Sequence, residues 1–133
     1  MPVTTPFSAL LRDVLARHPQ IEIAILFGSI ATGTARAESD IDLAVAWSVP
    51  LSPTTKSVLI ADLATSFGRP VDLIDLAQVG EPLLGQILRY GRRILGSDEH
   101  YANLLSRHLF DMADFMPYRR RILAERRRAW INA

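Results

Sequence analysis

The chain of 133 residues contains no cysteine, which excludes a disulfide framework and a zinc site built on thiolates. It has only three histidines, His18, His100 and His108, and their spacing matches no metal-binding motif. The absence of cysteine is compatible with a reducing compartment.

Long apolar runs are also missing. No segment approaches the ~20 consecutive apolar residues that a membrane-spanning helix needs. The amino end has no basic segment followed by a long apolar stretch, as a secretion signal would. We therefore expect a cytoplasmic protein that makes no contact with a membrane.

The chain as a whole has no marked excess of either charge, with 15 basic and 14 acidic residues. Residues 118–133 are the exception, because they hold six arginines and a single acid, Glu125. Three interpretations remain open for this end: a solvated helix with apolar side chains on the core, a surface for a partner protein, or a nucleic-acid site. The last is least favoured, since one basic end on a near-neutral chain is a weak electrostatic footprint.

The apolar content of 49% and the length indicate a single domain with a real core. The pattern predicts an α/β (α+β) fold with a small mixed sheet of about four strands and flanking helices. Residues 1–96 should form its core, and residues 97–133 a helical extension packed on that core. The apolar stripe of this extension comprises Leu105, Leu109, Met112 and Met116, and Pro117 should break its helix. Expected strands are Ile21–Phe27, Asp40–Trp47, Val71–Leu76 and Arg92–Leu95; expected helices begin at Thr5-Pro6, Thr54, Gly80-Glu81-Pro82 and Ser97-Asp98-Glu99.

Two aspartates stand one residue apart at the start of the second expected strand. Because side chains alternate along a strand, Asp40 and Asp42 should point to one face and Ile41 to the other. At about 6.6 Å and an effective dielectric of 20, their mutual repulsion is about 2.5 kcal/mol. Paired carboxylates on a rigid element are ligands that Mg²⁺ or Mn²⁺ takes alongside substrate phosphates. We interpret the pair as a metal site.

A Gly-Ser turn follows the first expected strand directly. Gly28 would let the backbone approach a phosphate closely, and Ser29 would open a short helix whose free N–H groups and hydroxyl face an anion. Gly33 follows a few residues later. The combination of this turn with the two aspartates, at this spacing, is rarely produced by chance. The turn predicts a phosphate site beside the metal site.

These residues resemble the nucleotidyltransferase superfamily related to DNA polymerase beta. Its signature of an apolar residue, Gly, Gly or Ser, a spacer, then Asp, apolar, Asp or Glu, apolar is matched by residues 27–29 and 40–43. Most of the chain looks like the minimal nucleotidyltransferase (MNT) group, whose members are often antitoxin partners of HEPN-domain ribonuclease toxins. Thr32 departs from the pattern, because many relatives carry Arg there.

The superfamily usually has a third carboxylate, and the segment Arg69–Leu76 offers two acids. Pro70 suits the start or edge of a strand, and alternation puts Asp72 and Asp75 on opposite faces. Only one of them can join the metal pair. The superfamily pattern of an aspartate between apolar residues selects Asp72.

The resemblance implies a mechanism for these residues. Asp40, Asp42 and Asp72 would hold two Mg²⁺ ions, and Gly28, Ser29 and Gly33 would bind the nucleotide. Displacement at the α-phosphorus of ATP would place AMP on a hydroxyl and release pyrophosphate, with Asp72 serving as ligand and general base together. The implied acceptor is a tyrosine of a HEPN toxin bound through the C-terminal helices. The alternatives are transfer to a small molecule such as an aminoglycoside, and an antitoxin that acts by binding alone.

Overall fold

The computed structural model describes residues 5–33 and 39–113, and its elements follow the predicted order. The predicted break at Pro117 and the arginine-rich segment 118–133 lie outside the described residues. One further helix, residues 98–113 as described, follows the last strand. The other elements are α1 (Thr5–Leu15), β1 (Ile21–Phe27), α2 (Gly28–Thr32), β2 (Ile41–Trp47), α3 (Pro53–Phe67), β3 (Val71–Asp75), α4 (Leu83–Tyr90) and β4 (Arg92–Gly96).

The four strands form one mixed sheet in the order β3-β2-β1-β4. Strand β1 runs antiparallel to β2 and to β4, whereas β2 and β3 are parallel. The parallel pair requires a crossover, and α3 provides it. This sheet confirms the predicted mixed architecture.

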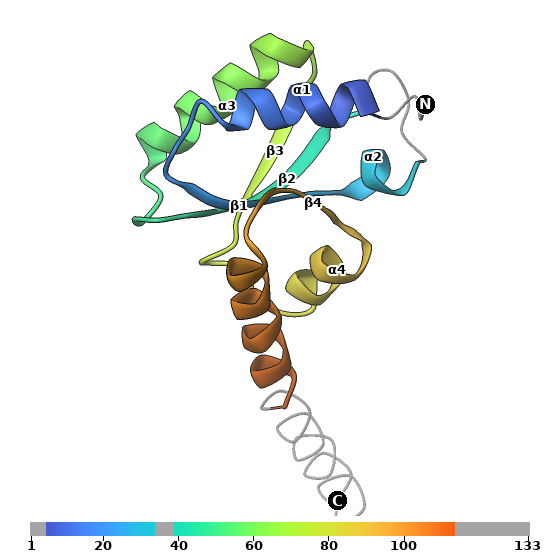
Figure 1. Ribbon diagram of the computed structural model, residues 1–133, viewed down its shortest axis with the longest axis vertical. Helices are drawn as coiled ribbons and strands as arrows, with labels where there is room; N and C mark the ends of the chain where they lie inside the picture. The colour runs from blue at the N-terminus through green and yellow to red at the C-terminus, as the bar shows by residue number, and fades with distance from the viewer. Residues whose placement is uncertain (1–4, 34–38, 114–133) are drawn as a thin grey trace, which may run out of the picture.

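Helices cover both faces of the sheet (Figure 1). On one face, α1 and α3 bury a cluster that includes Leu26, Leu43 and Leu63. On the other, α4 and helix 98–113 bury a second cluster that includes Ile25, Ala44 and Ile87. Neighbouring residues of β1 and β2 fall into different clusters, so both central strands are buried on their two faces.

Local signals explain where α3 begins and ends. The Ser52 hydroxyl accepts a hydrogen bond from the Thr55 N–H at 3.1 Å, and Pro53 occupies the first helical turn. This cap moves the start one residue ahead of the predicted Thr54. Gly68 ends the helix in the left-handed conformation (φ +63°), as its position after Phe67 predicts.

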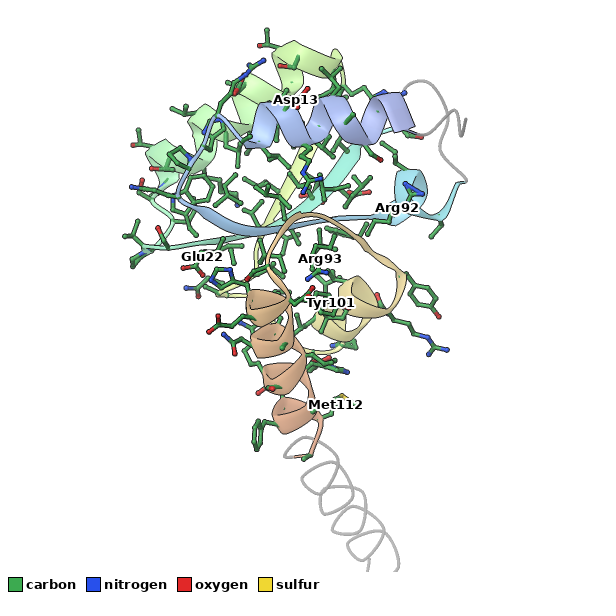
Figure 2. The ribbon with its side chains drawn as sticks, in the orientation of Figure 1. Asp13, Glu22, Arg92, Arg93, Tyr101 and Met112 are labelled. Carbon is green, nitrogen blue, oxygen red and sulfur yellow. The ribbon has the colours of Figure 1, made fainter. Side chains whose placement is uncertain are left out.

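Helix 98–113 packs on the second face through its first half. Leu104 is buried, the Tyr101 hydroxyl donates to the Leu88 carbonyl at 3.4 Å, and Arg107 donates to the Val79 carbonyl at 3.2 Å. Arg93 of β4 lies over the Tyr101 ring, with its guanidinium carbon 5.1 Å from the ring centroid (Figure 2). Two residues of the predicted apolar stripe, Leu105 and Leu109, are exposed instead of packed on this core.

Candidate active site

Asp42 lies at the end of the sheet, between the last residue of β1 and the start of β3. It pairs with Phe27 in the antiparallel ladder and with Asp72 in the parallel ladder. Asp40 immediately precedes β2, and the next N–H, that of Ile41, donates to the Pro70 carbonyl at 2.9 Å. The sheet therefore brings Asp40, Asp42 and Asp72 to the same end.

The three carboxylates influence one another electrostatically. Partial burial raises the pKa of the Asp42 carboxyl above its ordinary value, and the negative charges of Asp72 and then Asp40 raise it further. No ion pair neutralises any of the three within residues 5–33 and 39–113. The cluster is a concentration of negative charge that suits a cation.

Gly28 makes the closest approach to this cluster. Its φ of +73° favours glycine, and a Cβ added there would lie 2.1 Å from Oδ2 of Asp42. A side chain at position 28 would have to displace the Asp42 carboxylate. The sequence predicted that a phosphate would require this glycine, and the structure adds a second requirement from the protein's own carboxylate.

Ser29 and Gly33 lie in and after the short helix α2. Ser29 is the second of its five residues, directly after the glycine that contacts Asp42. Gly33 caps the other end in the left-handed conformation (φ +79°), and an added Cβ there would meet nothing within 4 Å. The structure thus gives Gly33 a conformational role in ending α2.

Asp72 and Asp75 are separated as strand alternation predicts. Asp72 is paired with Asp42, whereas an oxygen of Asp75 accepts from the Ala77 N–H at 3.0 Å in the turn that ends β3. That turn ends the strand one residue before the predicted Leu76. Asp75 also lines a hollow of 550 Å³ with Lys56, away from the carboxylate cluster.

Comparison with known proteins identifies the family. Residues 10–100 match the family described as "Polymerase beta, Nucleotidyltransferase". The chain belongs to this nucleotidyltransferase family.

Individual relatives extend the comparison. This nucleotidyltransferase is 33% identical over 90 residues to the protein adenylyltransferase MntA of Shewanella oneidensis, a match that covers 68% of this chain and 63% of MntA, which is less than two thirds of that relative's length. A toxin–antitoxin crystal structure with AMP-PNP has a TM-score of 0.77 at 24% identity and covers 89% of this chain and 96% of its own. The MNT antitoxin complex with the tri-AMPylated HEPN toxin of Shewanella oneidensis gives 0.66 at 24% identity, with 91% and 92% covered. The two structures share the fold.

The donor set of the nucleotidyltransferase site fits a hard divalent cation. Among the residues that the structure describes, no three His, Cys, Asp or Glu side chains already form a closed metal-binding group. Mg²⁺ does not need one, because it is usually held by one or two carboxylates together with substrate phosphates and water. Asp40, Asp42 and Asp72, which no ion pair neutralises in the part of the chain that the structure describes, meet that requirement at one end of the sheet.

One contact that positions these carboxylates has no signal in the sequence. The hydrogen bond from the Ile41 N–H to the Pro70 carbonyl ties the segment carrying Asp40 to the segment that leads into Asp72. From the sequence, Pro70 indicates only the start or edge of a strand. Its carbonyl partner depends on the β2–β3 register, which no local pattern shows.

Proposed function

We propose that this chain is a protein adenylyltransferase that transfers AMP from ATP to a hydroxyl, namely a tyrosine of a cognate HEPN toxin, and thereby acts as its antitoxin. The observation that carries the proposal is the position of Asp42 against Gly28 and beside Asp72 at the end of a nucleotidyltransferase sheet. The activity named for MntA, a relative at 33% identity, supports adenylyl transfer. The two toxin–antitoxin assemblies of the same fold support the type of partner.

Each site residue has a proposed task. Asp40, Asp42 and Asp72 would hold two Mg²⁺ ions, with Mn²⁺ as a substitute, and Gly28, Ser29 and Gly33 would bind the triphosphate. When bound, the metal ions supply charge neutralisation and a lower pKa for the acceptor hydroxyl. Asp72 is exposed, so it can pass a proton to solvent.

The reaction balances with these groups alone and the two substrates. The acceptor oxygen forms a bond to the α-phosphorus, and the bond from that phosphorus to the bridging oxygen breaks. Pyrophosphate leaves with the electron pair of the broken bond. The proton of the hydroxyl goes to the Asp72 carboxylate and then to water.

Two further predictions, on the domain organisation and on the cellular location, are part of the same proposal. Helix 98–113 contacts α4 and the loop before it, which supports treating residues 1–96 as the catalytic core and residues 97–133 as an extension on it. None of the helices in the described ranges is long and apolar enough to cross a membrane. We propose that the protein acts in the cytoplasm, where ATP and the toxin are both present.

The decisive experiment measures the intact mass of the product of the adjacent gene, which on this proposal is the HEPN toxin. It is purified after co-expression with the wild-type chain or with Asp42→Asn, which removes one proposed metal ligand while keeping the shape of the side chain. Adenylyl transfer predicts a mass gain of one or more AMP units with the wild type only. A stable complex without mass gain in either case would favour an antitoxin that acts by binding alone.

A transfer reaction with a free aminoglycoside tests the remaining alternative. The proposed acceptor is a tyrosine of a partner protein, so we expect no modified aminoglycoside after incubation with Mg²⁺ and ATP. Modification of the small molecule with no mass gain on the toxin would contradict the proposed acceptor.

A further inference from the structure

A groove of 370 Å³ lies between α4 and helix 98–113. Residues of α4 form one wall, including Gln86, Arg89 and Tyr90, and helix 98–113 contributes His108 and Met112 to the other. Both helices pack on the sheet face that carries Ala44, which by alternation is also the face of Asp42. The groove is therefore on the same side of the sheet as the carboxylate cluster.

One end of the groove lies close to the active site. Gly91, directly after Tyr90, packs against β1 so tightly that an added Cβ would lie 2.5 Å from Cγ2 of Ile25. The next residue, Arg92, pairs with Leu26, two residues before Gly28. Tyr90 thus stands at the mouth of the groove, beside the strand end that leads into the Gly-Ser turn.

The mouth carries side chains typical of protein interfaces. Tyr90 is 57% exposed, and the guanidinium carbon of Arg89 lies 5.3 Å from its ring centroid. The acid of the groove, Glu81, is already bound to His108 at 2.5 Å, which leaves Arg89 as an exposed positive charge. Tyrosine and arginine are enriched among the residues that dominate binding energy.

An apolar stripe, exposed at Leu105 and Leu109 and half-buried at Met112, continues the groove along helix 98–113. Leu105, Leu109 and Met112 share one side of the helix at the i, i+4, i+7 spacing, and Met112 also lines the groove, near the far end of the described helix (Figure 2). Leu105 is 40% exposed and Leu109 60%. Contiguous exposed apolar side chains beside a polar groove are characteristic of protein–protein contact surfaces.

We propose that this groove and stripe form the docking surface for the protein that receives AMP, an inference that rests on the proposed function. The occupant would lay an apolar helix face on Leu105, Leu109 and Met112. It would place an acidic side chain near Arg89 and its acceptor hydroxyl beyond Tyr90, at the carboxylates. Because Gly91 and Arg92, directly after Tyr90, lie against Ile25 and Leu26 of β1, a protein bound on this surface would lie beside the strand end that leads into Gly28.

The test compares Leu109→Ser and Tyr90→Ala with the wild type in two assays. The first assay measures the affinity for the proposed HEPN toxin, and the second measures the KM and kcat of AMP transfer to it. Each variant should weaken binding and raise KM by about tenfold, as expected for an interface anchor, with kcat nearly unchanged. The stabilisation by Mg²⁺ and ATP in a thermal melt should match the wild type.

Two exposed residues provide matched controls. Val58, 57% exposed, lies on α3 at the opposite face of the sheet, and Phe110, 73% exposed, lies on another side of helix 98–113. Val58→Ser and Phe110→Ser remove comparable apolar surface and should leave affinity and KM within about twofold of the wild type. An equal loss in either control would overturn the proposal.

Other outcomes are equally decisive. If Leu109→Ser lowers the melting temperature and leaves partner affinity unchanged, the stripe is covered by this chain itself and the proposal is wrong. If the wild type transfers no AMP while Leu109→Ser still weakens the complex, the docking surface stands and the proposed reaction fails. If AMP transfer occurs and KM is unchanged in both variants, the proposed reaction stands and the proposed docking surface is wrong.

Discussion

Asp42 is surrounded by groups that disfavour its negative charge. It is partly buried, Asp72 is its in-register neighbour on β3, and Asp40 lies two residues before it in the chain. A carboxylate in this position costs the ligand-free protein stability, and a bound cation would recover that cost. In the ligand-free protein, the ionised Asp42 carboxyl therefore lowers the free energy of unfolding.

We therefore expect Asp42→Asn to raise the melting temperature of the ligand-free protein at neutral pH. The folded-state pKa of Asp42 lies above its unfolded value, so the stability that its protonated form provides is present below about pH 3.9 and is lost as pH rises through the raised pKa. The gap between variant and wild type should open over that interval and vanish at lower pH. Thermal melts from pH 3 to 8 measure it; a gap that stays constant over this range would contradict the electrostatic origin.

Gly28 is a second residue of the site, and its surroundings leave no room for another amino acid. Gly28→Ala should lower kcat by on the order of a hundredfold, because a methyl group there must push the Asp42 carboxylate away from its position. The left-handed backbone adds about 1 kcal/mol of lost stability. Gly68→Ala carries the same backbone strain with nothing within 4 Å of the new methyl group, so it should lose stability alone. Steady-state transfer assays and chemical denaturation on both variants separate the two effects.

At the scale of elements, α3 determines where β3 is placed against β2. It is the crossover between the parallel strands, and its ends are set by Ser52 and Gly68. The pairing of Asp42 with Asp72 depends on this connection, because a one-residue slip of β3 would turn Asp72 to the other face.

Ser52→Ala should lower the free energy of unfolding by about 1 kcal/mol, since it removes the hydrogen bond that the Thr55 N–H donates to the side chain. Urea denaturation measures the change. Ser57→Ala, at an exposed position inside the same helix, is the matched control and should be neutral or slightly stabilising. A similar loss in both variants would indicate that capping is not the cause.

The elements could be predicted because their signals are local. Alternating or continuous apolar residues identify the strands, and Ser29, Pro53, Gly68 and Gly91 stand at or beside element boundaries. What could not be predicted depends on register between distant segments. The contact of Gly28 with Asp42 follows from the β1–β2 ladder, and the exposure of Leu105 and Leu109 follows from Tyr101 and Leu104 being the side chains that face the core.

For the molecule as a whole, ligand binding should raise the free energy of unfolding. If Mg²⁺ and ATP bind the native state alone, a concentration 100 times the dissociation constant adds about 2.7 kcal/mol to the free energy of unfolding. We expect a rise in melting temperature with both ligands, reversed by EDTA and much smaller in Asp42→Asn. An equal rise in the variant, or one that survives EDTA, would show that the nucleotide binds without the carboxylate site.

The two strand ladders that meet at Asp42 differ in the length of chain that must fold back to form them. The β1–β2 pairing joins neighbouring strands, whereas the β2–β3 pairing requires the whole α3 crossover to be in place. Closing a longer loop costs more conformational entropy, so contacts between strands that are distant in sequence form more slowly during folding. A nascent or refolding chain that has only its first two strands paired holds two of the three carboxylates. On the proposed function, catalytic competence should therefore be acquired only when the crossover has closed, and recovery of transfer activity should report the completion of folding.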